Sequence, residues 1–83
     1  MVLPDKPVTL TPEQIAELNK QLSTMRHDIN NNLSLVMAAI ELAKLKPESV
    51  TRMIATLSEQ PGKISATMTK FSVEFEKTFG ITR

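Results

Sequence analysis

Apolar residues recur along the first half of the chain in alternating steps of three and four, the spacing that places side chains on one face of an α-helix. Asn32 is the one polar residue that interrupts this row. The row widens after Leu33, which indicates that more than one partner helix packs near that end. Its members are Ile15, Leu18, Leu22, Met25, Ile29, Val36, Ala39 and Ala43.

Capping residues define the ends of this first helix. Thr11 is a suitable N-cap, Pro12 fits the first helical position, and Gln14 completes a capping box. Pro47 disfavours helical geometry in the residue before it. The sequence therefore predicts a first helix over about 12–46.

A second apolar row, from Val50 to Phe75, keeps the same alternation of steps. It predicts a second helix over about 47–79, which Gly80 ends as a C-cap. Pro61 is a conflict inside this helix, because a proline in a helix interior removes a hydrogen bond and costs about 3 kcal/mol. The row keeps its phase across Pro61, which favours a kinked but continuous helix over a break.

The loop between the two predicted helices is short, so the helices must be antiparallel neighbours. Two helices alone cannot bury rows this wide, and small chains with too little core often oligomerise. We therefore expect an all-α fold, an antiparallel two-helix hairpin that dimerises into a four-helix bundle. Residues 1–10 are expected to form an extended N-terminal arm, 11–80 the hairpin domain, and 81–83 a short tail.

Composition narrows the classes of function. Positive and negative charges nearly cancel, with 10 Lys and Arg against 9 Asp and Glu, which argues against a nucleic-acid partner. There is no cysteine, one histidine and no Gly-rich phosphate loop, so we expect neither a bound metal nor a cofactor. No signal-peptide pattern opens the chain, and no apolar stretch approaches the roughly 18 residues of a membrane span. These features predict a cytoplasmic protein that does not bind membranes.

The one histidine, His27, lies about 200° round the helix from the apolar residues two positions away, so it is expected to face solvent. Neutral imidazole is a nucleophile, and a carboxylate beside it fixes its tautomer and stabilises the cation that forms as a phosphoryl group arrives. Asp28 could provide that carboxylate, and Asn31, one turn further on, could position a water molecule or a phosphoryl oxygen. On spacing alone, an ordinary surface histidine explains the same residues, and that alternative stays open.

The seven residues HDINNNL at 27–33 resemble the H-box of sensor histidine kinases, whose pattern is His, acid, apolar, any, Thr or Asn, any, Leu. The resemblance extends in shape over residues 11–79 and implies a dimeric four-helix bundle. It implies that His27 is the phosphoacceptor and that Asp28 assists phosphorylation. Asp28 and Asn31 would match the acid-x-x-Thr/Asn pair that is linked to dephosphorylation of a response regulator. The chain departs from the family at Asn30, where many members carry a basic residue, and at Asn32, where many carry proline.

The function that this resemblance implies is His–Asp phosphorelay signalling. A homodimer would exchange the phosphoryl group with a response-regulator receiver domain, which brings its own Mg²⁺. The Asn-rich and Gly-rich boxes of the family's ATP-binding domain do not occur in this sequence, so we expect at most a histidine phosphotransferase or a response-regulator phosphatase. Such a chain could be a stand-alone carrier or a domain excised from a kinase. The alternative is a non-catalytic dimerisation or scaffold bundle, derived from a histidine kinase, in which the H-box is a relic.

Overall fold

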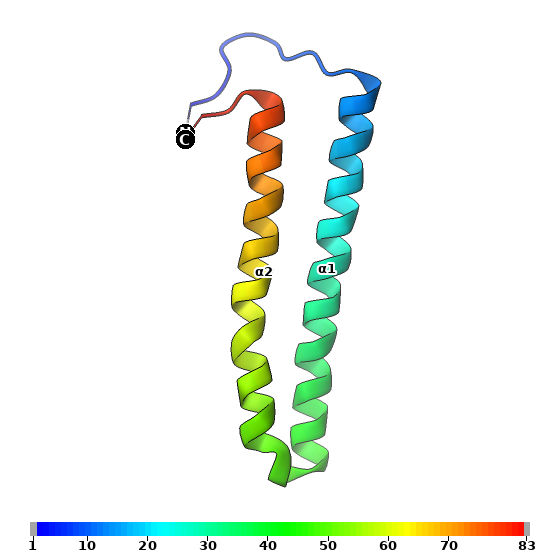
Figure 1. The fold of residues 1–83 in the computed structure, drawn as a ribbon, viewed down its shortest axis with the longest axis vertical. Coiled ribbons are helices and arrows are strands. Elements are labelled where there is room, and N and C mark those ends of the chain that lie inside the picture. Colours follow the sequence, from blue (N-terminus) through cyan, green and yellow to red (C-terminus); the bar gives the residue numbers. More distant parts are fainter. Residues whose placement is uncertain (1, 83) are drawn as a thin grey trace.

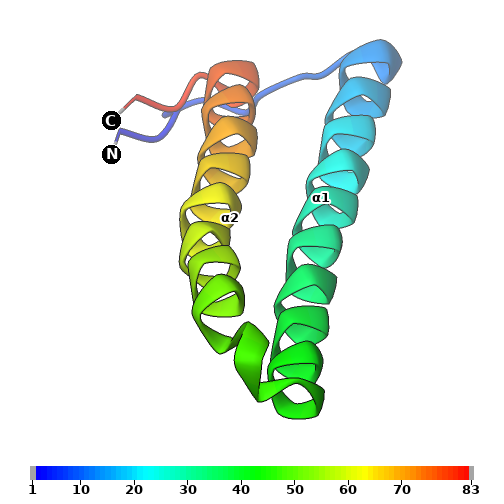
Figure 2. The same cartoon turned by 60° about the horizontal axis from the view of Figure 1, so that its bottom comes forward.

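Two long helices make up most of the molecule (Figure 1), whose computed structural model describes residues 2–82. Helix α1 spans Pro12–Leu45, helix α2 spans Val50–Phe79, and a single 3-10 turn, η1 (Pro47–Ser49), joins them. The two helices lie side by side and antiparallel in both views (Figures 1 and 2), so the predicted all-α helical hairpin is confirmed. The molecule is long and thin, with extents of 58 × 25 × 11 Å.

The N-terminal end of α1 has the predicted capping box. The hydroxyl of Thr11 accepts a hydrogen bond from the backbone N–H of Gln14 at 3.1 Å, and the side-chain oxygen of Gln14 accepts one from the N–H of Thr11 at 2.8 Å. These two bonds satisfy backbone donors that a helix start leaves without partners.

The turn between the helices differs in detail from the sequence expectation. Helix α1 ends at Leu45, and Lys46 leaves the helical region because Pro47 follows it. Residues 47–49, expected as the start of the second helix, form η1 instead. The buried hydroxyl of Ser49 donates to the carbonyl oxygen of Lys46 at 2.7 Å. That bond satisfies a carbonyl at the C-terminal end of α1 and holds the tight turn.

Helix α2 continues without interruption through Pro61. It ends at Gly80, whose φ of +69° is the left-handed conformation that glycine adopts at little cost. The N–H of Gly80 bonds the carbonyl of Lys77, and the N–H of Ile81 bonds that of Glu76 at 2.8 Å. This pair of bonds is a Schellman motif, which satisfies the last carbonyls of the helix.

The inner faces of the two helices change character along the hairpin. Near the loop they are mostly apolar, with Ala39 buried and Val36 and Ile64 half-buried, but they also hold the buried polar residue Gln60. Toward the open end they carry the half-buried polar residues Gln21 and Thr67. The core of the hairpin therefore lies in the half nearer to the loop.

A row of exposed apolar side chains, here called the apolar stripe, runs along one face of the hairpin. On each helix, at 100° per residue, these side chains lie about 80° round the helix axis from the side chains that face the other helix. The offset has the same rotational sense on both helices when each is followed from its N-terminus to its C-terminus. Because the helices are antiparallel, equal offsets place both rows on the same face of the molecule. The stripe consists of Ile15, Leu22, Leu33 and Ile40 on α1 and Ile54, Met68 and Phe75 on α2, each 36% exposed or more.

The N-terminal arm crosses the open end of the hairpin and meets the C-terminal tail (Figure 1). Val2 and Thr82 form an antiparallel backbone bridge, in which the N–H of Thr82 donates to the carbonyl of Val2 at 2.9 Å. Sequence patterns did not predict this pairing, because a bridge of two residues has no periodicity. Within residues 2–82, no helix is long and apolar enough to cross a membrane.

Candidate functional site

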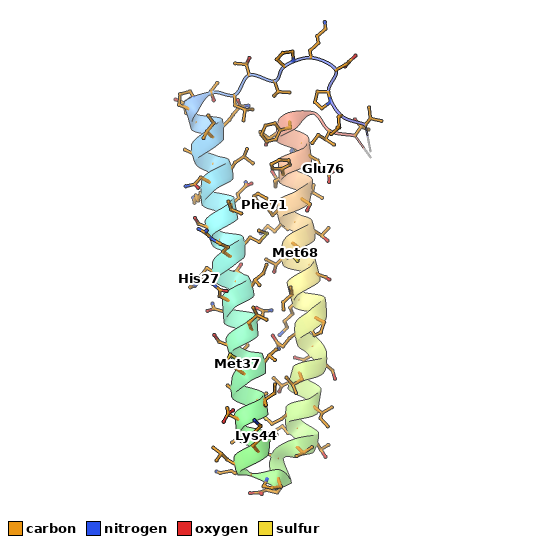
Figure 3. The ribbon with its side chains drawn as sticks, turned by 180° about the vertical axis from the view of Figure 1, so that it is seen from behind. His27, Met37, Lys44, Met68, Phe71 and Glu76 are labelled. Carbon is orange, nitrogen blue, oxygen red and sulfur yellow. The ribbon has the colours of Figure 1, made fainter. Side chains whose placement is uncertain are left out.

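His27 lies in the middle third of α1, on the edge that faces away from α2 (Figure 3). At 100° per residue, its side chain lies about 160° round the helix from the inner face. The side chain is exposed, as the sequence predicted. A partner protein can therefore approach the imidazole without disturbing the packing of the two helices.

Asn31 lies one helical turn from His27, and their side chains are in contact. The amide nitrogen Nδ2 of Asn31 lies 3.4 Å from Nε2 of the imidazole. An amide nitrogen can only donate, so this contact is a hydrogen bond in the tautomer whose Nε2 is unprotonated and accepts. In that tautomer the lone pair of Nε2 points toward Asn31.

Asp28 has a different neighbourhood from the one that its sequence position suggested. Its carboxylate makes no hydrogen bond or ion pair with another residue of the described chain, and so does not reach back to His27. Instead it lines a cavity between the two helices. The structure thus brings Asn31 to the imidazole and turns Asp28 toward the neighbouring helix.

This cavity, here called the cleft, lies in the open half of the hairpin and has a volume of about 380 Å³. Helical phase places its lining residues on the face opposite to the apolar stripe. Met25 and Phe71 are the only apolar residues among ten that line it. The polar residues are Glu17, Lys20, Gln21, Thr24 and Asp28 from α1 and Thr67, Lys70 and Glu74 from α2.

The charged side chains of the cleft are not neutralised by one another. Exposed ion pairs join Lys44 to Glu41, at 3.9 Å, and Lys63 to Glu59, at 3.7 Å. Neither involves a residue of the cleft. A polar atom there also lacks a partner, since Oε1 of Gln21 is buried and accepts no hydrogen bond. The cleft therefore holds charges of both signs and an available acceptor.

Sequence reasoning missed the α2 residues that line the cleft. Lys70 and Glu74 appear in the sequence as ordinary positions on a solvated helix face. Counting outward from the loop would have placed them level with residues 20–24 of α1, because antiparallel helices pair in reverse order. What the count could not give is the separation of the helices, which leaves a cavity there.

Comparison of the chain with models of known protein families, with curated proteins and with solved structures found no match. Among residues 2–82, no group of three or more metal-ligating side chains is close enough to hold a metal ion. The site must therefore be judged on its geometry and on its H-box-like sequence.

Proposed function

We propose that this chain is a His–Asp phosphotransfer module, in which His27 carries a phosphoryl group that it exchanges with a response-regulator receiver domain. The observation that carries this proposal is the exposed imidazole whose Nε2 lies 3.4 Å from the amide of Asn31. In the tautomer whose Nε2 accepts from Asn31, the ring has a nucleophilic lone pair at the surface, and the segment around it has the spacing of an H-box.

The chemistry assigns a separate task to each side chain. Nε2 of His27 attacks the phosphorus of the receiver's aspartyl phosphate, and the P–N bond forms as the P–O bond to the aspartate breaks. The freed carboxylate stays on the receiver with its Mg²⁺. The amide of Asn31, released from Nε2, donates to a phosphoryl oxygen, and the negative charge of Asp28 on the next residue favours the imidazolium that forms.

We propose further that the module is a homodimer with the architecture of a four-helix bundle. The chain exposes 6445 Å², whereas a folded monomer of 9.2 kDa is expected to expose about 4,900 Å². Its radius of gyration of 18.1 Å likewise exceeds the roughly 12 Å of a compact chain of this length. A two-fold dimer through the apolar stripe would bury much of this excess, since standard interfaces bury about 800 Å² per partner.

The dimer and the phosphotransfer site are compatible. The stripe and the cleft lie on opposite faces, and His27 lies on the outer edge of α1, so a dimer through the stripe leaves both imidazoles accessible. The rival function, a scaffold without chemistry, rests on the same stripe and makes no use of His27.

The experiment incubates the full chain with a panel of phosphorylated receiver domains and measures acid-labile phosphate on the chain by intact mass. Label on the wild type and none on His27→Gln is the result expected of a phosphocarrier. Dephosphorylation of a receiver without label on the chain, lost in Asp28→Ala and Asn31→Ala, would indicate a phosphatase instead. A folded dimer that neither accepts phosphate nor dephosphorylates any receiver of the panel would overturn the proposal in favour of the scaffold.

A further inference from the structure

We infer that the cleft between α1 and α2 binds a small zwitterion of the α-amino acid type. The inference concerns a different surface from His27 and does not depend on phosphoryl chemistry. It rests on the charges of both signs and the unpaired buried acceptor that line the cleft.

The inner faces of an antiparallel hairpin are normally where apolar side chains gather. In the loop half, Ala39 is buried and Ile64 half-buried, although Gln60, which is also buried there, is polar. In the open half, the inward positions hold Gln21, Thr67 and Glu74, all half-buried. Thr67 donates to the carbonyl of Lys63 at 2.9 Å, and Nε2 of Gln21 donates to Oε1 of Glu17 at 3.3 Å. Oε1 of Gln21 and the carboxylate of Glu74, however, have no partner in the described chain. Half-buried polar atoms without partners weaken packing, so these two groups favour a ligand.

Charges of both signs surround the cavity and are free to bind. Lys20 and Lys70 reach it from opposite helices, and neither lies within 4.0 Å of a carboxylate. Asp28 and Glu74 also line it without an ion-pair partner. A ligand with one charge would meet repulsion from part of this lining, whereas a zwitterion satisfies both sets.

The remaining features fit the rest of such a ligand. The buried Oε1 of Gln21 accepts no hydrogen bond in the hairpin and can accept one from an ammonium group. Met25 and Phe71 supply the apolar surface for a side chain. The volume of about 380 Å³ lies at the lower end of the range for small-molecule sites. The ligand carboxylate would then lie between Lys20 and Lys70, with its ammonium group at Gln21 and Glu74.

The location has a consequence for Asp28. Its carboxylate lines the cleft and follows His27 directly in the sequence, so an occupied cleft changes the charge around the H-box-like segment. Because the cleft lies on the face opposite to the apolar stripe, a dimer through the stripe leaves it open. Each protomer would hold its own ligand.

The test is an NMR titration of the ¹⁵N-labelled full chain with L-leucine, L-phenylalanine and glycine. Saturable shifts are expected at the amides of Gln21 and Lys70 and not along the apolar stripe. Leucinamide lacks the carboxylate and 4-methylpentanoate lacks the ammonium group, so each should bind at least about tenfold more weakly than leucine, as loss of a charge-assisted contact predicts.

Matched variants locate the ligand. Lys70→Met and Glu74→Gln should weaken binding about tenfold or more, whereas Lys77→Met, on the same helix but outside the cleft, should leave it unchanged. His27→Gln should also bind normally, which separates failure of this proposal from failure of the phosphotransfer function. The inference is wrong if no amino acid gives saturable shifts up to about 10 mM, or if leucinamide binds as well as leucine.

Discussion

Gln60 provides the sharpest test of how this hairpin is held together. It is the most buried side chain of the described chain, at 1% exposed, and it lies on the inner face of α2. Its Nε2 donates to the carbonyl of Thr56 at 3.1 Å, but its Oε1 is buried without a hydrogen-bond partner. Replacement by methionine, which has similar volume, removes that unsatisfied oxygen and keeps the space filled.

The expected gain follows from the cost of the unpaired oxygen. A buried acceptor without a partner costs about 1–3 kcal/mol. The bond to Thr56 is lost as well, but that carbonyl keeps its backbone partner one helical turn on, so little is forfeited. Gln60→Met should therefore stabilise the fold by about 1–2 kcal/mol, which raises the Tm of a domain of this size by about 4–16 °C.

The assay is thermal unfolding followed by circular dichroism at one fixed protein concentration, because self-association makes Tm depend on concentration. Gln21→Met is the comparison, since its Oε1 is also unpaired but the residue is only half-buried, so its gain should be smaller. An unchanged or lower Tm in Gln60→Met would refute the reasoning and would mean that Oε1 has a partner in solution, in a second copy of the chain or in bound water.

Three further perturbations follow from the fold. Met68→Asp places a charge on the apolar stripe and should yield a monomer in size-exclusion chromatography with light scattering. Val73→Asp is the control, because Val73 is equally exposed, at 51%, but lies off the stripe, and this variant should stay dimeric. Identical elution of the two variants would contradict an interface at the stripe. Thr11→Ala removes the capping box and should cost about 1 kcal/mol in denaturant unfolding, and no loss would show that the N-terminal turn is frayed. Pro61→Ala restores a helical hydrogen bond to the carbonyl of Leu57 and should stabilise α2 by as much as about 3 kcal/mol. Amide hydrogen exchange at residue 61 and its neighbours measures this gain. A loss of stability would show that the proline is needed for packing.

The fold could be predicted from the sequence because its signals are local and regular. Thr11, Pro12 and Gln14 define the start of α1, and the left-handed Gly80 ends α2. The apolar residues of α1 form two groups on different sides of the helix, and the sequence did not separate them. Met25 and Val36 face the partner helix, whereas Ile15 and Leu22 belong to the exposed stripe; steps of three and four are shared by both faces, so spacing alone cannot separate them.

The candidate site was accessible to sequence reasoning only in part. Exposure of His27 and its contact with Asn31 follow from the geometry of one helix, which 100° per residue describes well. The direction of the Asp28 carboxylate depends on the space beside α2, and that space depends on the separation of two helices. Such a distance is set by the summed volumes of side chains that meet across the hairpin, which no single-helix pattern contains.

Pairing of Val2 with Thr82 fixes the direction in which the molecule would respond to mechanical force. Both ends of the described chain lie at the end of the molecule opposite η1 (Figure 1). Tension between them therefore pulls the two helices apart from that end and does not slide one helix along the other. In that geometry contacts break one after another, beginning at the polar open half that contains the cleft. The loop half, around Ala39 and Ile64, would be loaded last. A weak pull would therefore reshape the cleft first and leave the core of the hairpin packed.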